Sequence, residues 1–129
     1  MEEIKEWLEK AEKDFFRAEF CLANKDFEDY AFHAHQAVEK ALKALYIKKF
    51  KRLWKTYDLV GLGSKLRIDK NLLKLCDELN RHYIETRYPT GAEYTSEVAE
   101  RAIKNSKKLL EWIKKEIKNK GIVDEVKGI

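Results

Sequence analysis

Apolar residues recur at intervals of three and four along most of this chain, the spacing that aligns side chains on one face of an α-helix. The pattern extends over four long segments and is interrupted between them. We expect a further short helical piece near residues 58–60, and no stretch has the strict alternation typical of a β-strand. The sequence therefore predicts an all-α, up-and-down bundle of four to five helices, with long helices at about 2–24, 27–50, 70–86 and 96–120.

Polar and helix-breaking residues mark the ends of these helices. Asp26 precedes the second helix, where an aspartate can accept a hydrogen bond from the first free backbone amides. Pro89 should end the third helix, because proline restricts the residue before it, and Gly121 should end the last one. We therefore expect a single helical domain over residues 1–120 and a loose C-terminal tail over residues 121–129.

The composition indicates a folded protein. Of its 129 residues, 44% are hydrophobic and 39% are charged, which excludes a disordered chain and provides for one core. No apolar run approaches the roughly 18 residues of a membrane span, and the acidic N-terminus does not resemble a signal peptide. We therefore expect a cytoplasmic protein without a membrane partner. Interleaved lysine and glutamate, with a single glutamine, favour a thermophilic source.

The cysteines and histidines do not follow a metal-binding pattern. Cys21 and Cys76 each lie within an apolar helical pattern, so we interpret both as reduced, structural residues. His33 and His35 are two positions apart and would point about 200° from each other on a helix, so they cannot share a metal ion. We expect neither a metal site nor a cofactor.

Two helices carry aromatic residues away from their apolar stripes. On the second helix, Phe32 and Gln36 lie opposite the wide apolar sector. On the first helix, Phe16 and Phe20 lie well off the stripe. Because exposed aromatic side chains commonly mark contact surfaces, we expect these four residues at the interface of a homodimer.

A polar cluster projects from the third helix, where Asn80, Tyr83 and Arg87 share one face. Such groups need partners, since an unpaired buried polar group costs roughly 1–3 kcal/mol. In one interpretation Arg87 pairs with a carboxylate such as Asp14, and Asn80 caps a loop, so that the cluster locks helices together. In the other, these residues with Asp14 and Lys40 line a cleft that binds a phosphate or ribose.

The histidines of the second helix allow further interpretations. His33 lies near Gln36 and could act as a general acid or base, because an unperturbed histidine has a pKa close to 6.5. A plain surface histidine is the alternative. His35 and Glu39 form an i,i+4 pair that we expect only to stabilise the helix.

Residues 48–55 form a concentrated basic patch in which Phe50 and Trp54 stand among lysines and an arginine. Cations can contact phosphates and aromatic rings can stack on bases, so nucleic acid is one possible ligand. Basic residues also favour the last turn of a helix, so a solvated helix end is the alternative.

Residues 32–43 read Phe-His-Ala-His-Gln-Ala-Val-Glu-Lys-Ala-Leu-Lys, and residues 79–89 contain Leu-Asn, Tyr and Arg-Tyr-Pro. These segments resemble the second- and third-helix signatures of the HEPN family (higher eukaryotes and prokaryotes nucleotide-binding). Four residues at helical spacing resemble its first helix. They are Trp7, Ala11, Asp14 and Ala18. The three segments follow the family's order and together cover about residues 4–112.

This resemblance implies an HEPN-like bundle that dimerises through parts of its second and third helices. It also implies a nucleotide- or RNA-associated binding module whose partner is a separately encoded minimal nucleotidyltransferase, in a toxin–antitoxin-like or substrate-presenting role. A structural homodimer without catalysis is one alternative.

The other alternative is a metal-independent RNase. Many HEPN ribonucleases carry an arginine closely followed by a histidine, thought to lie at the dimer cleft. Here Tyr57 and Tyr88 occupy the nearest matching positions after Arg52 and Arg81, and a phenol is a poor proton shuttle at neutral pH. We therefore lean against an enzyme. A degenerate active site would have to use His33, Tyr83 and Arg87, of which His33 and Arg87 are the candidate catalytic residues.

Overall fold

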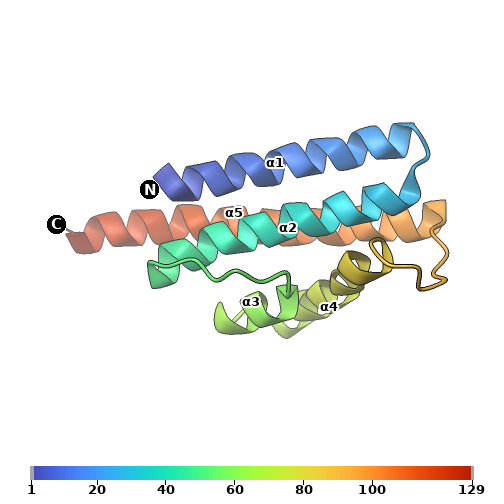
Figure 1. Ribbon diagram of the computed structural model, residues 1–129. Helices are drawn as coiled ribbons and strands as arrows, with labels where there is room; N and C mark the ends of the chain where they lie inside the picture. The colour runs from blue at the N-terminus through green and yellow to red at the C-terminus, as the bar shows by residue number, and fades with distance from the viewer. Residues whose placement is uncertain (1, 129) are drawn as a thin grey trace.

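The computed structural model describes the backbone of residues 2–128 and the side chains of residues 2–118. Within the described backbone there are five helices and no strand, so the predicted all-α bundle is confirmed. Figure 1 shows their arrangement. The helices are α1 (Glu2–Ala23), α2 (Phe27–Phe50), α3 (Leu59–Lys65), α4 (Lys70–Glu85) and α5 (Ser96–Gly128).

The first two helices form an antiparallel pair joined by a tight turn (Figure 1). Lys25 adopts a left-handed conformation with φ of 58°. Asp26 caps α2 as predicted, because its side chain accepts a hydrogen bond from the amide of Asp29 at 3.2 Å. α1 packs closely along α2, where small residues such as Ala11 and Ala18 are buried.

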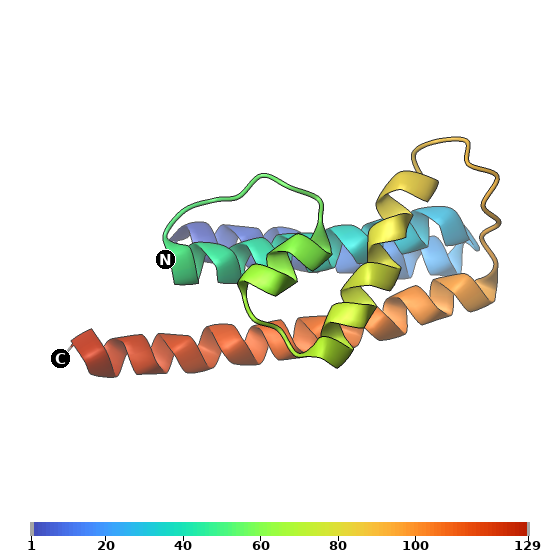
Figure 2. The same cartoon turned by 90° about the horizontal axis from the view of Figure 1, so that it is seen from below.

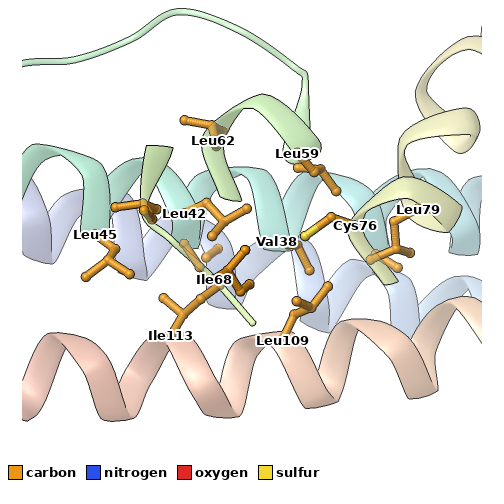
Figure 3. Packing of buried hydrophobic residues seen from close by; sticks show 14 of the residues in the cluster. Val38, Leu42, Leu45, Leu59, Leu62, Ile68, Cys76, Leu79, Leu109 and Ile113 are labelled. Carbon is orange, nitrogen blue, oxygen red and sulfur yellow. The ribbon is translucent and has the colours of Figure 1, made fainter. Parts of the chain in front are cut away.

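The centre of the bundle is α2, which packs against all four other helices. In Figure 3 Val38, Leu42 and Leu45 of α2 meet apolar side chains from α3, α4 and α5. Complete burial of one such side chain contributes about 1.5–3 kcal/mol relative to exposure. Because these residues face the core, the residues on the other side of α2 remain available for the contacts of the candidate site.

α3 and α4 lie on the side of α2 opposite α1, and Figure 2 shows them in front of α2 in the view from below. The approach of α3 to α4 requires a glycine at position 63. A Cβ atom there would lie 2.8 Å from Cγ2 of Ile68 and 3.0 Å from Cδ1 of Leu73. The loop before α3 is held against α2 by the hydrogen bond between the Tyr57 carbonyl and His35, and against α4 by the one between Asp58 and Asn80, where the candidate site lies.

One predicted helix end is wrong. The last helix was expected to end at Gly121, but α5 continues to Gly128. A glycine in a helix interior costs only about 1 kcal/mol relative to alanine, so it does not stop a helix by itself. The side chains of residues 119–129 lie outside those described, and the domain boundary at residue 120 stays a prediction. Among the described residues, no helix is long and apolar enough to cross a membrane.

Candidate functional site

A buried carboxylate connects α1 with α2. Asp14 is 2% exposed. Its Oδ1 accepts hydrogen bonds from Nδ1 of His33 at 3.2 Å and from Arg17 at 3.4 Å, and its Oδ2 accepts one from Nζ of Lys40. Arg17 and Lys40 thus place two basic side chains on a single carboxylate. These three donors satisfy the buried carboxylate.

Arg87 does not reach this carboxylate. It is exposed, donates a hydrogen bond to the hydroxyl of Tyr83 at 2.7 Å, and places its guanidinium carbon 4.8 Å from the centroid of the Tyr83 ring. The proposed Arg87–Asp14 pair is therefore wrong. The physical reason is that cations of α1 and α2, which lie beside Asp14, already satisfy its oxygen atoms.

Tyr83 is the centre of an aromatic cluster that extends toward Asp14. Its ring stacks on Tyr57 with centroids 4.2 Å apart and planes within 3°. It also lies 6.4 Å from Phe32, whose ring contacts His33 at 5.4 Å. A continuous line of side chains thus crosses three helices, and we call it the cross-helix row. Its members are Arg87, Tyr83, Phe32, His33, Asp14 and Lys40.

Asn80 has a structural partner next to this row. Its Oδ1 accepts a hydrogen bond from the amide of Leu59 at 2.8 Å, and its Nδ2 donates one to Oδ1 of Asp58, also at 2.8 Å. The same Asp58 oxygen accepts from the amide of Val60 at 3.0 Å. Asn80 and Asp58 therefore cap α3 together, as the loop-capping interpretation of Asn80 anticipated.

We expect Asn80→Ala to lower the free energy of unfolding by about 1–3 kcal/mol, because the Leu59 amide would lose its acceptor. Asn80→Asp keeps an acceptor but places a second carboxylate beside Asp58, so it should not restore stability. Urea denaturation of both variants measures this, with Asn71→Ala, an exposed asparagine at the start of α4, as a control near zero. A stability loss under about 0.5 kcal/mol for Asn80→Ala would contradict the capping role.

The sequence matches the HEPN domain family over residues 4–117. The chain belongs to the HEPN family. This confirms the family that the helix signatures suggested, and the match covers most of the chain.

Relatives of this HEPN chain are similar over nearly their whole length. A protein of Methanocaldococcus jannaschii named "Putative toxin MJ1304" is 29% identical over an alignment that covers 88% of each sequence. The crystal structure of TT1696 from Thermus thermophilus is 26% identical with a TM-score of 0.82, covering 90% of this chain and 99% of that one. ST0689, an archaeal HEPN homologue, has the same fold at 23% identity, with a TM-score of 0.75 and coverage of 91% and 99%.

His35 has a role in this HEPN domain that the sequence did not reveal. It is completely buried, and its Nε2 donates a hydrogen bond to the backbone carbonyl of Tyr57 at 3.1 Å. Burial lowers its pKa, so the ring is neutral at pH 7. The predicted pair with Glu39 is not a hydrogen bond, because Glu39 accepts one from Lys43 at 2.9 Å; its charge only opposes part of the lowering of the His35 pKa. His35 follows Ala31 by one helical turn within the buried stripe, and that position was the available signal.

The four residues expected at a dimer interface do not form one surface. Phe16 and Phe20 are 70% and 66% exposed. Phe16 borders a groove of about 590 Å³ between α1 and α5, whereas Phe32 contacts Tyr83 of α4. Gln36 is half-buried, with its amide 3.2 Å from Nδ1 of His35. Phe32 and Gln36 therefore lie on the side of the cross-helix row, and the two phenylalanines of α1 lie elsewhere.

The remaining titratable groups do not add a metal site. Among the described residues, no three His, Cys, Asp or Glu side chains are placed to hold a metal ion. Cys76 lies in the core, where burial raises the pKa of its thiol to about 12. The side chains of the cross-helix row offer hydrogen bonds, charge, aromatic rings and the imidazole of His33.

Proposed function

We propose that this HEPN domain is a nucleotide- or RNA-binding module that acts with a separately encoded minimal nucleotidyltransferase in a toxin–antitoxin-like system. The cross-helix row is the observation on which the proposal rests. It joins solvent-reaching cations to stacked aromatic rings on one side of the bundle. The name of the archaeal relative, which describes a toxin, supports the assignment of this role.

The chemistry of the row suits a nucleotide. Arg87 uses one guanidinium nitrogen on Tyr83, and its remaining N–H groups can form a fork with phosphate oxygens. Tyr57 is the more exposed ring of the tyrosine pair, at 42%, so a base could stack on it. Lys40 and Arg17 border a groove of about 250 Å³ at the other end of the row. Phosphate and base contacts are thus available within one ligand-binding surface.

We further propose that the chain forms a homodimer through the faces of α2 and α4 that flank the row. Phe32 and Gln36 are half-buried there and would become covered by a second copy. Light scattering at micromolar concentration should then give about twice the chain mass of 15.3 kDa. A mass that stays at 15.3 kDa up to about 100 µM would contradict the dimer.

Binding is tested most sharply by Arg87→Ala, with Arg81→Ala, a second exposed arginine that lies in α4, as the matched control. Because Arg87 is exposed and contacts only Tyr83 among described side chains, its removal should change stability by less than about 1 kcal/mol. Affinity for ATP or labelled RNA, measured by calorimetry, should fall about tenfold or more, as loss of a charge-assisted contact predicts. Equal affinities of the two variants would contradict a ligand site at the row.

The partner is tested separately. The tagged chain should be expressed together with the product of any neighbouring gene that encodes a short nucleotidyltransferase, and the two should co-purify through a size-exclusion column. If the neighbouring genes encode no such protein, or if the two proteins elute separately, the partner assignment fails while nucleotide binding can still hold.

One contact favours RNase activity as a second candidate function. Nδ1 of His33 bonds to Asp14, an arrangement that orients an imidazole and leaves Nε2 available for proton transfer. We expect activity on labelled RNA to be undetectable or low, unaffected by EDTA, and lower still in His33→Ala. Robust cleavage that survives both His33→Ala and Arg87→Ala would place the chemistry on other residues.

A further inference from the structure

The positive charge of this protein is concentrated in one short segment. Residues 47–67 contain seven basic residues and one acidic residue, a net charge of +6. The other 108 residues contain 20 basic and 22 acidic residues, a net charge of −2. The net charge of +4 for the whole chain therefore originates in the end of α2, the following loop and α3.

Helix-end electrostatics explain only part of this charge. Lys48 and Lys49 lie in the last turn of α2, where cations are favoured, but Lys51 is already the left-handed cap of that helix. Arg52 and Lys55 come after the helix, in the extended loop. Both are exposed, and neither forms an ion pair with any side chain that the structure describes. Their charge remains available to a polyanion.

The same segment contains a cluster of aromatic rings. Tyr46 lies 4.6 Å from Phe50 and 5.8 Å from Trp54, measured between ring centroids. The Trp54 indole packs toward α3, where a Cβ atom at Gly61 would lie 3.1 Å from its Cη2 atom. This packing holds a half-buried indole in a fixed position at the protein surface.

A pocket of about 390 Å³ opens beside this indole. Its volume lies in the range of ordinary small-ligand sites. The pocket combines aromatic and apolar walls with two cations from different elements. It is lined by Tyr46, Arg52, Leu53, Trp54 and Lys65.

We propose that this pocket and the cations around it form a binding site for single-stranded nucleic acid, separate from the cross-helix row. One unpaired base stacks at the Trp54 indole, and Arg52, Lys55 and Lys65 bind the adjoining phosphates. Sites of this kind combine a cationic surface with aromatic stacking, and they require unpaired bases. The site does not depend on Arg87 or on the row.

The loop places the Trp54 pocket close to the cross-helix row. Trp54 and Tyr57 are three positions apart, an extended distance of about 10 Å. Because Tyr57 stacks on Tyr83, a strand held at Trp54 would lie within one or two nucleotides of that second aromatic surface. Binding at the Trp54 pocket would therefore place a strand beside the cross-helix row.

The test uses fluorescein-labelled rU12, dT12 and a 12-base-pair RNA duplex, with anisotropy measured from about 50 to 300 mM NaCl. Arg52→Ala/Lys55→Ala is compared with Lys104→Ala/Lys108→Ala, which removes the same charge from exposed positions of α5. If both loop cations contact phosphates, the salt slope should fall by about 1.4 and affinity for a single strand by about 25-fold at roughly 0.1 M salt. The α5 variant should bind as the wild type does.

Trp54 provides a readout that general electrostatics would not affect. Single-stranded RNA should quench the tryptophan fluorescence, and Trp54→Phe should abolish that quench while retaining most of the affinity, since phenylalanine also stacks. Trp54→Ala should weaken binding about tenfold. Equal losses in the two double variants, equally tight binding of the duplex, or a quench that persists in Trp54→Phe would each overturn the site. Arg87→Ala tests the row independently, so the two proposals can fail separately.

Discussion

Asp14→Ala should lower the free energy of unfolding by about 3–5 kcal/mol, the largest effect expected of any substitution in the site. The carboxylate is buried and bonded to Lys40, His33 and Arg17. Its removal would leave Lys40 and His33 partly buried, with side chains 21% and 23% exposed, and without their shared acceptor. The cost arises from the unpaired charge that remains, more than from the lost attraction.

A double-mutant cycle separates these contributions. Lys40→Met should also be strongly destabilising, but Asp14→Ala/Lys40→Met should cost clearly less than the sum of the two, because it leaves no unpaired partner in that pair. Glu12→Ala is the control. Its carboxylate lies 4.0 Å from Lys114 with both side chains mostly exposed, so the change should be below about 0.5 kcal/mol. Additive effects at Asp14 and Lys40, measured by urea denaturation, would contradict a coupled pair.

Acidification should destabilise the protein through His82. This ring is 4% exposed, and burial, with a smaller contribution from Arg81, lowers its pKa to about 4. The unfolded chain has a histidine pKa near 6.5, so it binds more protons than the folded chain between about pH 6.5 and 4. The contribution of His82 to stability is therefore fully present above about pH 6.5. As the pH falls, the free energy of unfolding decreases, by about 3 kcal/mol at pH 4 from this group.

The variant His82→Gln isolates this contribution. It lacks the titrating ring, so its stability should change less between about pH 7 and pH 4.5 than that of the wild type, although it loses some stability at pH 7. His35 has a pKa shifted in the same direction and will leave part of the dependence in place. The Tyr94 hydroxyl donates to Glu85 and accepts from Nδ1 of His82. The near-UV circular dichroism of Tyr94 should therefore change as His82 becomes protonated. An unchanged pH dependence in His82→Gln would contradict the assignment.

Local signals predicted most of the helices, because their causes are local. The Asp26 cap and the three-four periodicity placed α2 at Phe27–Phe50, as observed. The helix end predicted at Gly121 was wrong, because a glycine ends a helix only when the chain can turn into another conformation there. The helix signatures also identified the family from the sequence alone.

Contacts between helices were harder to predict, since they depend on which faces meet. Asp14 is 26 residues from Lys40 and 19 from His33, and nothing in the spacing favoured these partners over Arg87. The role of Asn80 was anticipated as a cap, but its partners Asp58 and Leu59, at the start of α3, lie 22 and 21 residues away. His35 and His82 were not assigned these contacts because their burial depends on the packing of α3, α4 and the loop before α5.

The enclosure of α2 by four neighbours has a consequence for motion. Its backbone amides should exchange with deuterated solvent only when the whole molecule opens, whereas peripheral turns should exchange through local fluctuations. Lys40, His33 and Phe32 therefore belong to the segment whose amides we expect to exchange most slowly. A ligand that binds there meets side chains whose backbone is already ordered, so little conformational entropy is lost on the protein side when the complex forms.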